Sequence, residues 1–440
     1  MIAFVSLFLG LVAGPQVVEV AVDPAVARVE IRLGDRLLGT LDGPPWQLPC
    51  ELGRDLEPAE LSAVAFDAEG RELGVARQRL NLLRQPAEVS LVIEEGPDDR
   101  PAAVRLAWES VTGSGPRRLT ITLDGRPLPV ADPHRIELPP HDPRQLHFLR
   151  AELDFSDTVT SVAELAFGGT YGDQVTAELT GVPVELLEGA EPPPAAELAG
   201  WFLRRGEPLE VVAVEKGTAD AVVVPDRGAL PGLRRMERQI GYFIRARGLG
   251  VSVSHGLRHG FPLGPDQRLR LLWPFPEAQR GSSIQFAIFP TSAEYGRDDA
   301  GVYWLLLRLQ PKARASAPQK LADGVAVAGL AAAGRSRRRA VVLVMGAEPE
   351  DRSQLSPWAV RHYLRSLRVP FRVWVTNAKA LEEASAWGPL TGVADPEALA
   401  EAVRELSEAL ERQRVVWVRG THLPQEIELS PRAAGIRLVE

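Results

Sequence analysis

The segment from Leu321 to Thr376 constrains the fold of this chain more than any other. Its first part places apolar residues at helical spacing, namely Leu321, Val325, Ala328 and Ala332. Every residue of the following run, Ala340–Met345, is apolar. A strand that is apolar on both sides needs cover on both faces, so it belongs in the middle of a helix-covered sheet. A second helix, capped by Ser356 with Pro357 at its first position, and a second strand ending at Thr376 complete a pattern that predicts an α/β domain.

The same alternation extends over residues 199–440. Strands are predicted at DAVVVPD, RLRLLWPF and RVVWVRG, and a helical face begins near Leu233. Asp395 and Pro396 repeat the cap pattern before a long amphipathic helix. We therefore predict a doubly wound, Rossmann-like sheet over residues 199–440.

Residues 17–85 alternate apolar and polar side chains with period two, which is typical of β-strands. Turn residues at Gly34-Asp35 and at Asp67–Gly70 separate the strands of two hairpins. Pro44 and Pro45 cannot donate to a strand ladder, so the chain is expected to cross between sheets there. The segment resembles the immunoglobulin-like β-sandwich modules of secreted bacterial proteins.

A second period-two region covers residues 86–188 and repeats parts of the first pattern, which predicts a second β-sandwich. The Pro- and Ala-rich residues 189–198 are predicted to be a linker.

The amino terminus carries an uninterrupted run of apolar and small residues from Ile2 to Gly14. The run is shorter than the roughly 20 residues that span a bilayer, so it indicates a signal peptide over residues 1–16 and export to the periplasm or the exterior, with no transmembrane anchor afterwards. The alternative is a buried first strand.

The net charge of −8 gives little long-range attraction for nucleic acid. The single cysteine, Cys50, cannot form a disulfide within the chain. Arg335-Ser336-Arg337-Arg338-Arg339 forms a short basic run, interpreted as a solvated loop or an anion contact. His255 and His259 have the spacing of helical metal ligands, but Gly256 and Gly260 argue against a helix, and no zinc site is predicted.

The α/β part resembles the von Willebrand factor A domain on three segments: DGVAVAGLAAAGRSRRRAVVLVMG, SPWAVRHYLRSLRVPFRVWVT and GVADPEALAEAVRELSEALERQRVVWV. Together with the preceding immunoglobulin-like modules, it is similar to the exported VWFA-related proteins of acidobacteria. The resemblance implies an adhesion-type module whose partner is a protein.

That family binds Mg²⁺ through Asp-x-Ser-x-Ser after the first strand, a threonine, and an aspartate after the fourth strand. Asp226 matches the leading aspartate, but Gly228 and Leu230 stand where the serines belong. Met345-Gly346 replaces the later acid, and Thr291 alone could fill the threonine role. Asp226 and Thr291 are thus vestigial metal candidates, and we predict a metal-free site without a cofactor. An acidic loop with Glu348, Glu350 and Asp351 leaves open a rebuilt site.

The binding face is predicted at the carboxyl ends of the strands, where ligands of open α/β sheets bind. Its residues are Asp226, Arg227, Gly228, Thr291, Glu348, Glu350, Asp351 and Arg352. No nucleophile elbow, Walker loop or dinucleotide fingerprint is present, so no catalytic residue is predicted. Two alternatives remain: a hydrolase or transferase that uses Asp226, His255 and Glu348 in the same crevice, and a purely architectural envelope component.

Overall fold

The chain divides into two compact units: Met1–Leu82 with Gly181–Val416 and Leu423–Glu440, and Leu83–Thr180 with Trp417–His422. In the computed structural model, the described residues are 2–6, 8, 10–82, 87–95, 101–110, 115–124, 126–142, 146–156, 159–168, 179–187, 190–191, 193–246, 253–275, 277–279, 285–287, 289–309, 318–334, 337–346, 351–377 and 384–440.

The first β-sandwich consists of seven strands in two sheets, with the orders β1-β2-β5 and β4-β3-β6-β7. Inward-facing residues of both sheets, such as Val18 and Leu61, share one core, which confirms the predicted sandwich. The strands are β1 (Ile2–Phe4), β2 (Pro15–Val22), β3 (Arg28–Leu33), β4 (Arg36–Leu41), β5 (Gln47–Glu51), β6 (Ala59–Phe66) and β7 (Glu72–Leu80).

The predicted turns of this sandwich are confirmed. Gly34 and Asp35 connect β3 to β4, and residues 67–71 connect β6 to β7, where Asp67 accepts a hydrogen bond from the Arg71 backbone N–H. The two prolines, Pro44 and Pro45, lie between β4 of one sheet and β5 of the other. The chain crosses between the sheets there, as the missing proline donors require.

The second unit is also a β-sandwich, as predicted. Its sheets have the orders β11-β10-β13-β14 and β12-β9-β8, and both contribute to one core that includes Leu106 and Leu149. The strands are β8 (Ala87–Glu95), β9 (Pro101–Ser110), β10 (Arg118–Leu123), β11 (Arg126–Pro127), β12 (Ile136–Glu137), β13 (Leu146–Ser156) and β14 (Val159–Gly168).

Five parallel strands with the order β20-β19-β23-β24-β25 form the sheet that the segment around Ala340 predicts. All eight residues of β23 are buried, which explains its apolar run at the centre of the sheet. The strands are β19 (Ala219–Pro225), β20 (Gln267–Leu271), β23 (Arg338–Met345), β24 (Phe371–Val375) and β25 (Leu390–Gly392).

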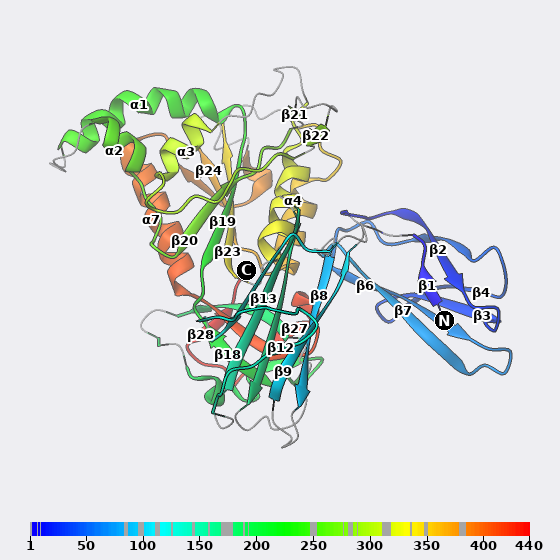
Figure 1. Cartoon of the computed structure of the whole chain (residues 1–440). Coiled ribbons are helices and arrows are strands. Elements are labelled where there is room, and N and C mark those ends of the chain that lie inside the picture. The colour runs from blue at the N-terminus through cyan, green and yellow to red at the C-terminus, as the bar shows by residue number, and fades with distance from the viewer. Residues whose placement is uncertain are drawn as a thin grey trace. The chain divides into compact units, whose positions relative to one another are not determined.

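Helices cover both faces of this sheet (Figure 1). Residues of α1, α3 and α7 share a core with one face, and residues of α4 and α5 share a core with the other. The predicted caps are confirmed, because Ser356 accepts from the Ala359 N–H and Asp395 accepts from the Ala398 N–H. The helices are α1 (Ala229–Ala246), α3 (Val302–Arg308), α4 (Leu321–Ala333), α5 (Pro357–Ser366) and α7 (Pro396–Arg412).

A separate four-stranded sheet has the order β18-β26-β15-β28. The strand after α7, RVVWVRG, was expected in the parallel sheet, but it lies here as β26, between β18 and β15. Strand β15, which lies within the predicted range of the second sandwich, pairs with β28 in this sheet. Its strands are β15 (Leu179–Leu186), β18 (Val211–Glu215), β26 (Gln413–Arg419) and β28 (Ile436–Leu438).

The remaining described elements are short: β16 (Phe202–Arg204), β17 (Glu207–Pro208), β21 (Glu277–Gln279), β22 (Gln285–Ala287), β27 (Ile427–Leu429), α2 (Val253–His259), η1 (Ala195–Leu198), η2 (Ala384–Trp387) and η3 (Pro424–Glu426). Within the described ranges, none of the helices combines the length and the apolar composition needed to cross a membrane.

Candidate functional site at the carboxyl edge of the parallel sheet

The order of the parallel sheet makes the junction of β19 and β23 a topological switch point. In sequence order the five strands are arranged 2-1-3-4-5, so the helices that follow β19 and the neighbouring β23 leave toward different faces of the sheet. Ligands of open α/β sheets bind at such a switch point, beyond the carboxyl ends of the strands. Asp226 directly follows β19 and Gly346 directly follows β23, so both belong to this edge.

The carboxylate of Asp226 joins three segments of the chain at this point. Its Oδ1 accepts hydrogen bonds from the Gly228 N–H at 3.0 Å and from Gln319 Nε2 at 2.7 Å. Its Oδ2 accepts from the Gly346 N–H at 2.9 Å. Asp226 is only 3% exposed, and these bonds offset the cost of burying its carboxylate. We call Asp226, Gly228, Gln319 and Gly346 the Asp226 knot.

Gly346 allows the ends of β19 and β23 to approach closely. A Cβ atom at this position would lie 1.8 Å from the carbonyl oxygen of Gly228 and 1.9 Å from its carbonyl carbon. Both neighbours are backbone atoms, which cannot rotate away. Gly346 therefore has no space for any side chain in this fold.

Gln319 completes the knot through both ends of its amide. While Nε2 donates to Asp226, Oε1 accepts from the Arg227 N–H at 3.0 Å, and the Gln319 backbone carbonyl accepts from the Arg352 N–H at 2.7 Å. Gln319 is 3% exposed. Sequence reasoning missed this residue, because its partner Asp226 is 93 positions away and no motif surrounds it.

Arg227 and Thr291 lie at the same edge of the sheet. The Arg227 guanidinium carbon lies 4.1 Å from the centre of the Phe275 ring, a cation–π geometry. Thr291 is exposed and forms an antiparallel bridge with Leu272, at the carboxyl end of β20. Because β20 neighbours β19, Thr291 lies about two strand spacings, roughly 10 Å, from the β19 strand. It is outside the Asp226 knot.

Asp351 acts as a helix cap. Its Oδ1 accepts from the Leu321 N–H at 2.8 Å, and its Oδ2 accepts from the Ala322 N–H at 3.2 Å. These two N–H groups begin α4, where the positive end of the helix dipole favours a carboxylate. Glu348 and Glu350, the other acids of the predicted loop, lie outside the described residues.

These contacts restrict what the edge can do chemically. A carboxylate offers about four acceptor positions, and the knot uses three of those on Asp226. Mg²⁺ requires an octahedron of oxygen ligands at about 2.0–2.1 Å. Among the described residues, no group of three or more His, Cys, Asp or Glu side chains is arranged to hold a metal ion.

The two histidines with metal-ligand spacing lie on a helix, which corrects the prediction that Gly256 and Gly260 argue against one. His255 and His259 belong to α2, with ring centres 4.5 Å apart. Gly260 lies just after this helix, where its carbonyl oxygen would be 1.7 Å from a Cβ on Gly301. Hydrogen bonds thus join Asp226 to Gly346 and Gln319, and the rings of His255 and His259 are in contact.

The last two residues of the basic run, Arg338 and Arg339, are buried at the start of β23, so the interpretation as a solvated loop is wrong for them. They are 0% and 2% exposed. Arg338 donates to the Leu410 carbonyl at the end of α7 and to Asp266, and Arg339 donates to the Ala333 carbonyl at the end of α4. Cations at the carboxyl ends of helices offset the helix dipole, which explains both positions.

The second sandwich contains a buried histidine that the sequence did not indicate. Nδ1 of His147 lies 2.7 Å from an Asp124 carboxylate oxygen, and Nε2 lies 2.9 Å from the Asp142 carbonyl oxygen. Both partners are hydrogen-bond acceptors, so the arrangement favours the protonated ring, in which both nitrogens donate. Burial opposes this charge, but the bonds to Asp124 and Asp142 outweigh it and raise the pKa of His147 above its ordinary value.

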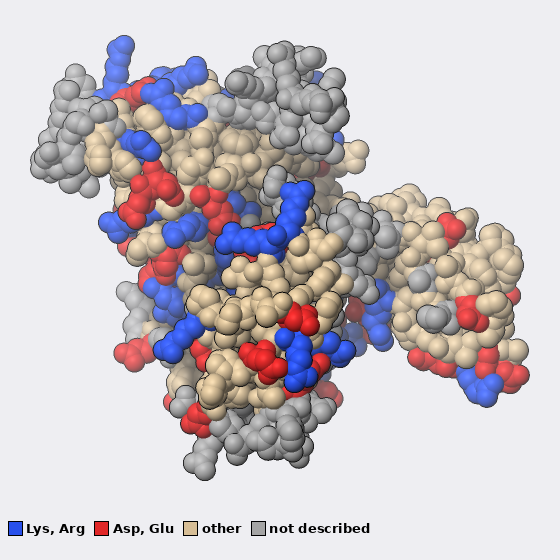
Figure 2. All heavy atoms as spheres, in the orientation of Figure 1, with Lys and Arg blue, Asp and Glu red and all other residues tan. Residues whose placement is uncertain are grey.

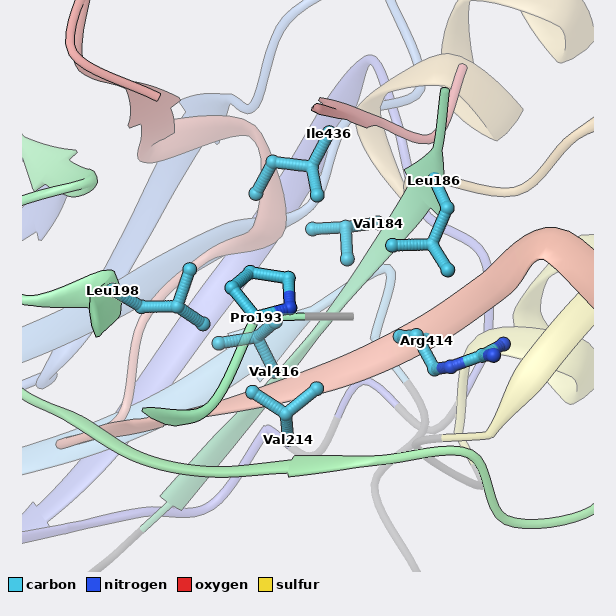
Figure 3. A pocket seen from close by; sticks show the side chains of 8 residues that line it. All are labelled: Val184, Leu186, Pro193, Leu198, Val214, Arg414, Val416 and Ile436. Carbon is cyan, nitrogen blue, oxygen red and sulfur yellow. The ribbon is translucent and has the colours of Figure 1, made fainter. Parts of the chain in front are cut away.

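A small apolar hollow lies elsewhere, in the sheet that contains β26 (Figure 3). It encloses at most about 190 Å³, whereas ligand pockets usually measure about 300–1,000 Å³. The hollow is therefore too small for a substrate and does not coincide with the Asp226 knot. Its lining residues are Val184, Leu186, Pro193, Leu198, Val214, Arg414, Val416 and Ile436.

Charges of both signs are interspersed over the face shown in Figure 2. Many are paired, as in the exposed contacts of Arg404 with Glu401 and Glu408 on α7. A field of a single sign, which would attract nucleic acid, is not seen on that face.

Comparisons with known proteins give only distant likenesses. No protein-family model matches the chain, and no curated protein matches it. The fibronectin(III)-like modules of Clostridium thermocellum CbhA are 13% identical, with 18% of this chain and 93% of that chain covered and a TM-score of 0.17. The central fibronectin-III array of RIM-binding protein is 10% identical, with 47% and 80% covered and a TM-score of 0.22. Scores this low support no argument about fold or function.

Proposed function

We propose that this chain is a non-enzymatic, exported protein-interaction module whose parallel-sheet part is a von Willebrand factor A-like domain without a metal site. The three sequence segments that resemble that family support the assignment, as does a parallel sheet covered by helices on both faces. The predicted binding face includes Asp226, Arg227, Thr291 and Arg352 at the carboxyl edge of the sheet.

One observation carries the metal-free part of the proposal. The two oxygens of Asp226 accept hydrogen bonds from Gly228, Gln319 and Gly346, which lie on three different segments. In a metal-dependent A domain, the ion would connect these segments. Here hydrogen bonds do so, and Gly346 leaves no space for the second acid. The carboxylate is thus a structural acceptor, which also argues against its use as a general base in the hydrolase alternative.

Binding of Mn²⁺ tests this proposal directly. We expect calorimetric titration of the full chain with Mn²⁺ or Mg²⁺ to show no saturable site at the sheet edge, and Asp226→Ala to lower the unfolding temperature without changing the titration. The matched control is Asp395→Ala, which removes a carboxylate that caps α7 away from the knot. Saturable Mn²⁺ binding that is lost in Asp226→Ala and kept in Asp395→Ala would overturn the proposal.

The protein-interaction part is tested separately. Crosslinking in the producing cells, followed by mass spectrometry, should yield crosslinks from the face that contains Arg227 and Arg352 to one other protein. A charge reversal at exposed Arg352 should reduce those crosslinks, whereas reversal of exposed Arg404 on α7 should leave them unchanged. Equal crosslinking in both variants argues against this face. Activity that is lost in His255→Ala, with the fold retained, favours the hydrolase alternative.

A further inference from the structure

The described residues of the segment Ile2–Gly14 pair with and pack against the first sandwich, and we call the surface that they cover the groove. Its strand β1 pairs antiparallel with β2, with Ile2 opposite Val22 and Phe4 opposite Val20 (Figure 1, blue). Four apolar side chains of the segment, Ile2, Phe4, Phe8 and Val12, pack against the core of the sandwich. The neighbouring Leu11 packs against the core on one face of the parallel sheet instead.

Two buried amides of β7 and the residue after it hold the backbone of the segment. Gln78 is 3% exposed, and its amide accepts from the Phe8 N–H at 2.8 Å and donates to the Ser6 carbonyl at 3.2 Å. Asn81 is 5% exposed, and its amide accepts from the Val12 N–H at 2.7 Å and donates to the Val12 carbonyl at 2.9 Å.

These contacts recognise a peptide backbone and not a particular sequence. Each amide offers one donor and one acceptor to main-chain groups, so any extended residue could satisfy it. A buried amide is costly without partners, and both the donor and the acceptor of the Gln78 amide bond to this segment. Asn81 also donates to the Glu57 carbonyl at 2.7 Å, so it would keep one partner without the segment. Removal of the segment would leave the β2 edge, the Gln78 amide and the apolar surface beneath Phe4 and Phe8 uncovered.

The segment that fills the groove is the same one that the sequence predicts to be removed on export. We propose that the mature first sandwich is a strand-acceptor module, which binds an extended, uncharged, apolar strand of a partner protein in the groove now occupied by Ile2–Gly14. Addition of a strand to an open sheet edge is an established mode of peptide binding. This inference rests on the export part of the proposed function and is independent of the Asp226 knot.

The test begins with the full chain carrying a protease site between Gly14 and Pro15. The protein folds with the segment in place, the site is cut, and a fluorescent peptide with the sequence of residues 2–14 and a solubilising tail is added. We expect the peptide to exchange into the groove and raise the fluorescence anisotropy. The uncut chain should bind at least a hundredfold more weakly, because its own segment competes at an effective concentration in the millimolar range.

Matched variants identify the groove. Gln78→Met removes both amide hydrogen bonds at similar volume and should weaken peptide binding about tenfold or more. The control, Gln47→Ala, alters an exposed glutamine on β5 of the same sandwich and should leave the affinity unchanged. A peptide with aspartate in place of both phenylalanines should not bind.

Several results would overturn the proposal: no uptake by cut protein, equal uptake in Gln78→Met, or unfolding of the sandwich on release of the segment. Mass spectrometry of the exported protein supplies an independent criterion. An amino terminus that retains Ile2–Gly14 means that the groove is filled in cis, which also overturns the proposal. None of these outcomes affects the metal-free knot, and Mn²⁺ binding at Asp226 would not affect the groove.

Discussion

Substitution of Gly346 by alanine tests the packing of the Asp226 knot. The added Cβ would lie 1.8 Å from the Gly228 carbonyl oxygen and 2.5 Å from the Ala229 nitrogen. To restore an ordinary contact, the ends of β19 and β23 must separate by about 1.5 Å. That separation breaks the hydrogen bond from the Gly346 N–H to the buried Asp226 carboxylate.

The expected loss of stability has two parts. Overpacking of a close contact costs about 1–3 kcal/mol. Loss of a hydrogen bond to a buried charged group costs about 1.5–3 kcal/mol. Together they lower the free energy of unfolding by about 2.5–6 kcal/mol. A loss in the middle of that range corresponds to a fall in Tm of about 10 °C for a domain of this size.

Urea denaturation combined with hydrogen exchange in peptides from β19 and β23 measures this loss where it occurs. The control is Gly392→Ala on β25 of the same sheet, where a Cβ would meet nothing within 4 Å. Its effect should stay within about 0.5 kcal/mol, as for an ordinary surface substitution. Equal stability of the two variants would refute the close approach at Gly346 and, with it, the steric reason for the missing acid.

Two further predictions concern buried charges. Because the pKa of His147 is raised, its contribution to the stability of the second unit is complete below the ordinary pKa of about 6.5 and disappears as the pH rises through the raised folded value. The urea concentration at the midpoint of unfolding should therefore be higher near pH 5.5 than near pH 8.5. His147→Gln should abolish this difference. Arg338→Met should destabilise the parallel-sheet part by about 3 kcal/mol, because it removes the buried donor of the Leu410 carbonyl and leaves Asp266 with Lys216 as its remaining cation. Arg404→Met, at an exposed pair, should cost less than about 1 kcal/mol in the same urea titration.

The local features of this fold could be read from the sequence because they depend on neighbouring residues. Ser356 and Asp395 fix the starts of α5 and α7, because each side chain accepts a hydrogen bond from a backbone N–H only three residues further on. Gly34-Asp35 specifies a hairpin for the same reason. The central strand could also be predicted, because the run Ala340–Met345 is entirely apolar and must therefore be buried on both faces of a sheet.

Features that depend on distant residues could not be predicted. The period of β26 shows that it is a strand, but nothing in its sequence shows that it pairs with β15 and β18 instead of joining the parallel sheet. The basic run is polar by composition, and only the distant carbonyls of Leu410 and Ala333 explain why Arg338 and Arg339 are buried.

The candidate site shows the same division. The place of Asp226 at the edge of the sheet could be predicted, because it directly follows a recognisable apolar strand. Gln319 could not be found, since its role depends on a partner 93 residues away. Asp351 was grouped with a possible metal loop because acids cluster there in sequence, whereas its oxygens cap α4. The functional assignment itself, including the A-like domain and export, stays a proposal.

The Asp226 knot also has a consequence for regulation. A face organised by Mg²⁺ can be switched, because removal of the ion releases the segments that it joins. The knot joins its segments through hydrogen bonds from Gly228, Gln319 and Gly346, and no change in ion concentration removes those donors. Under the proposed function, binding at this edge is therefore constitutive. A partner captured there should stay bound in a chelator such as EDTA, and its release by EDTA would show that an ion, and not the knot, organises the face.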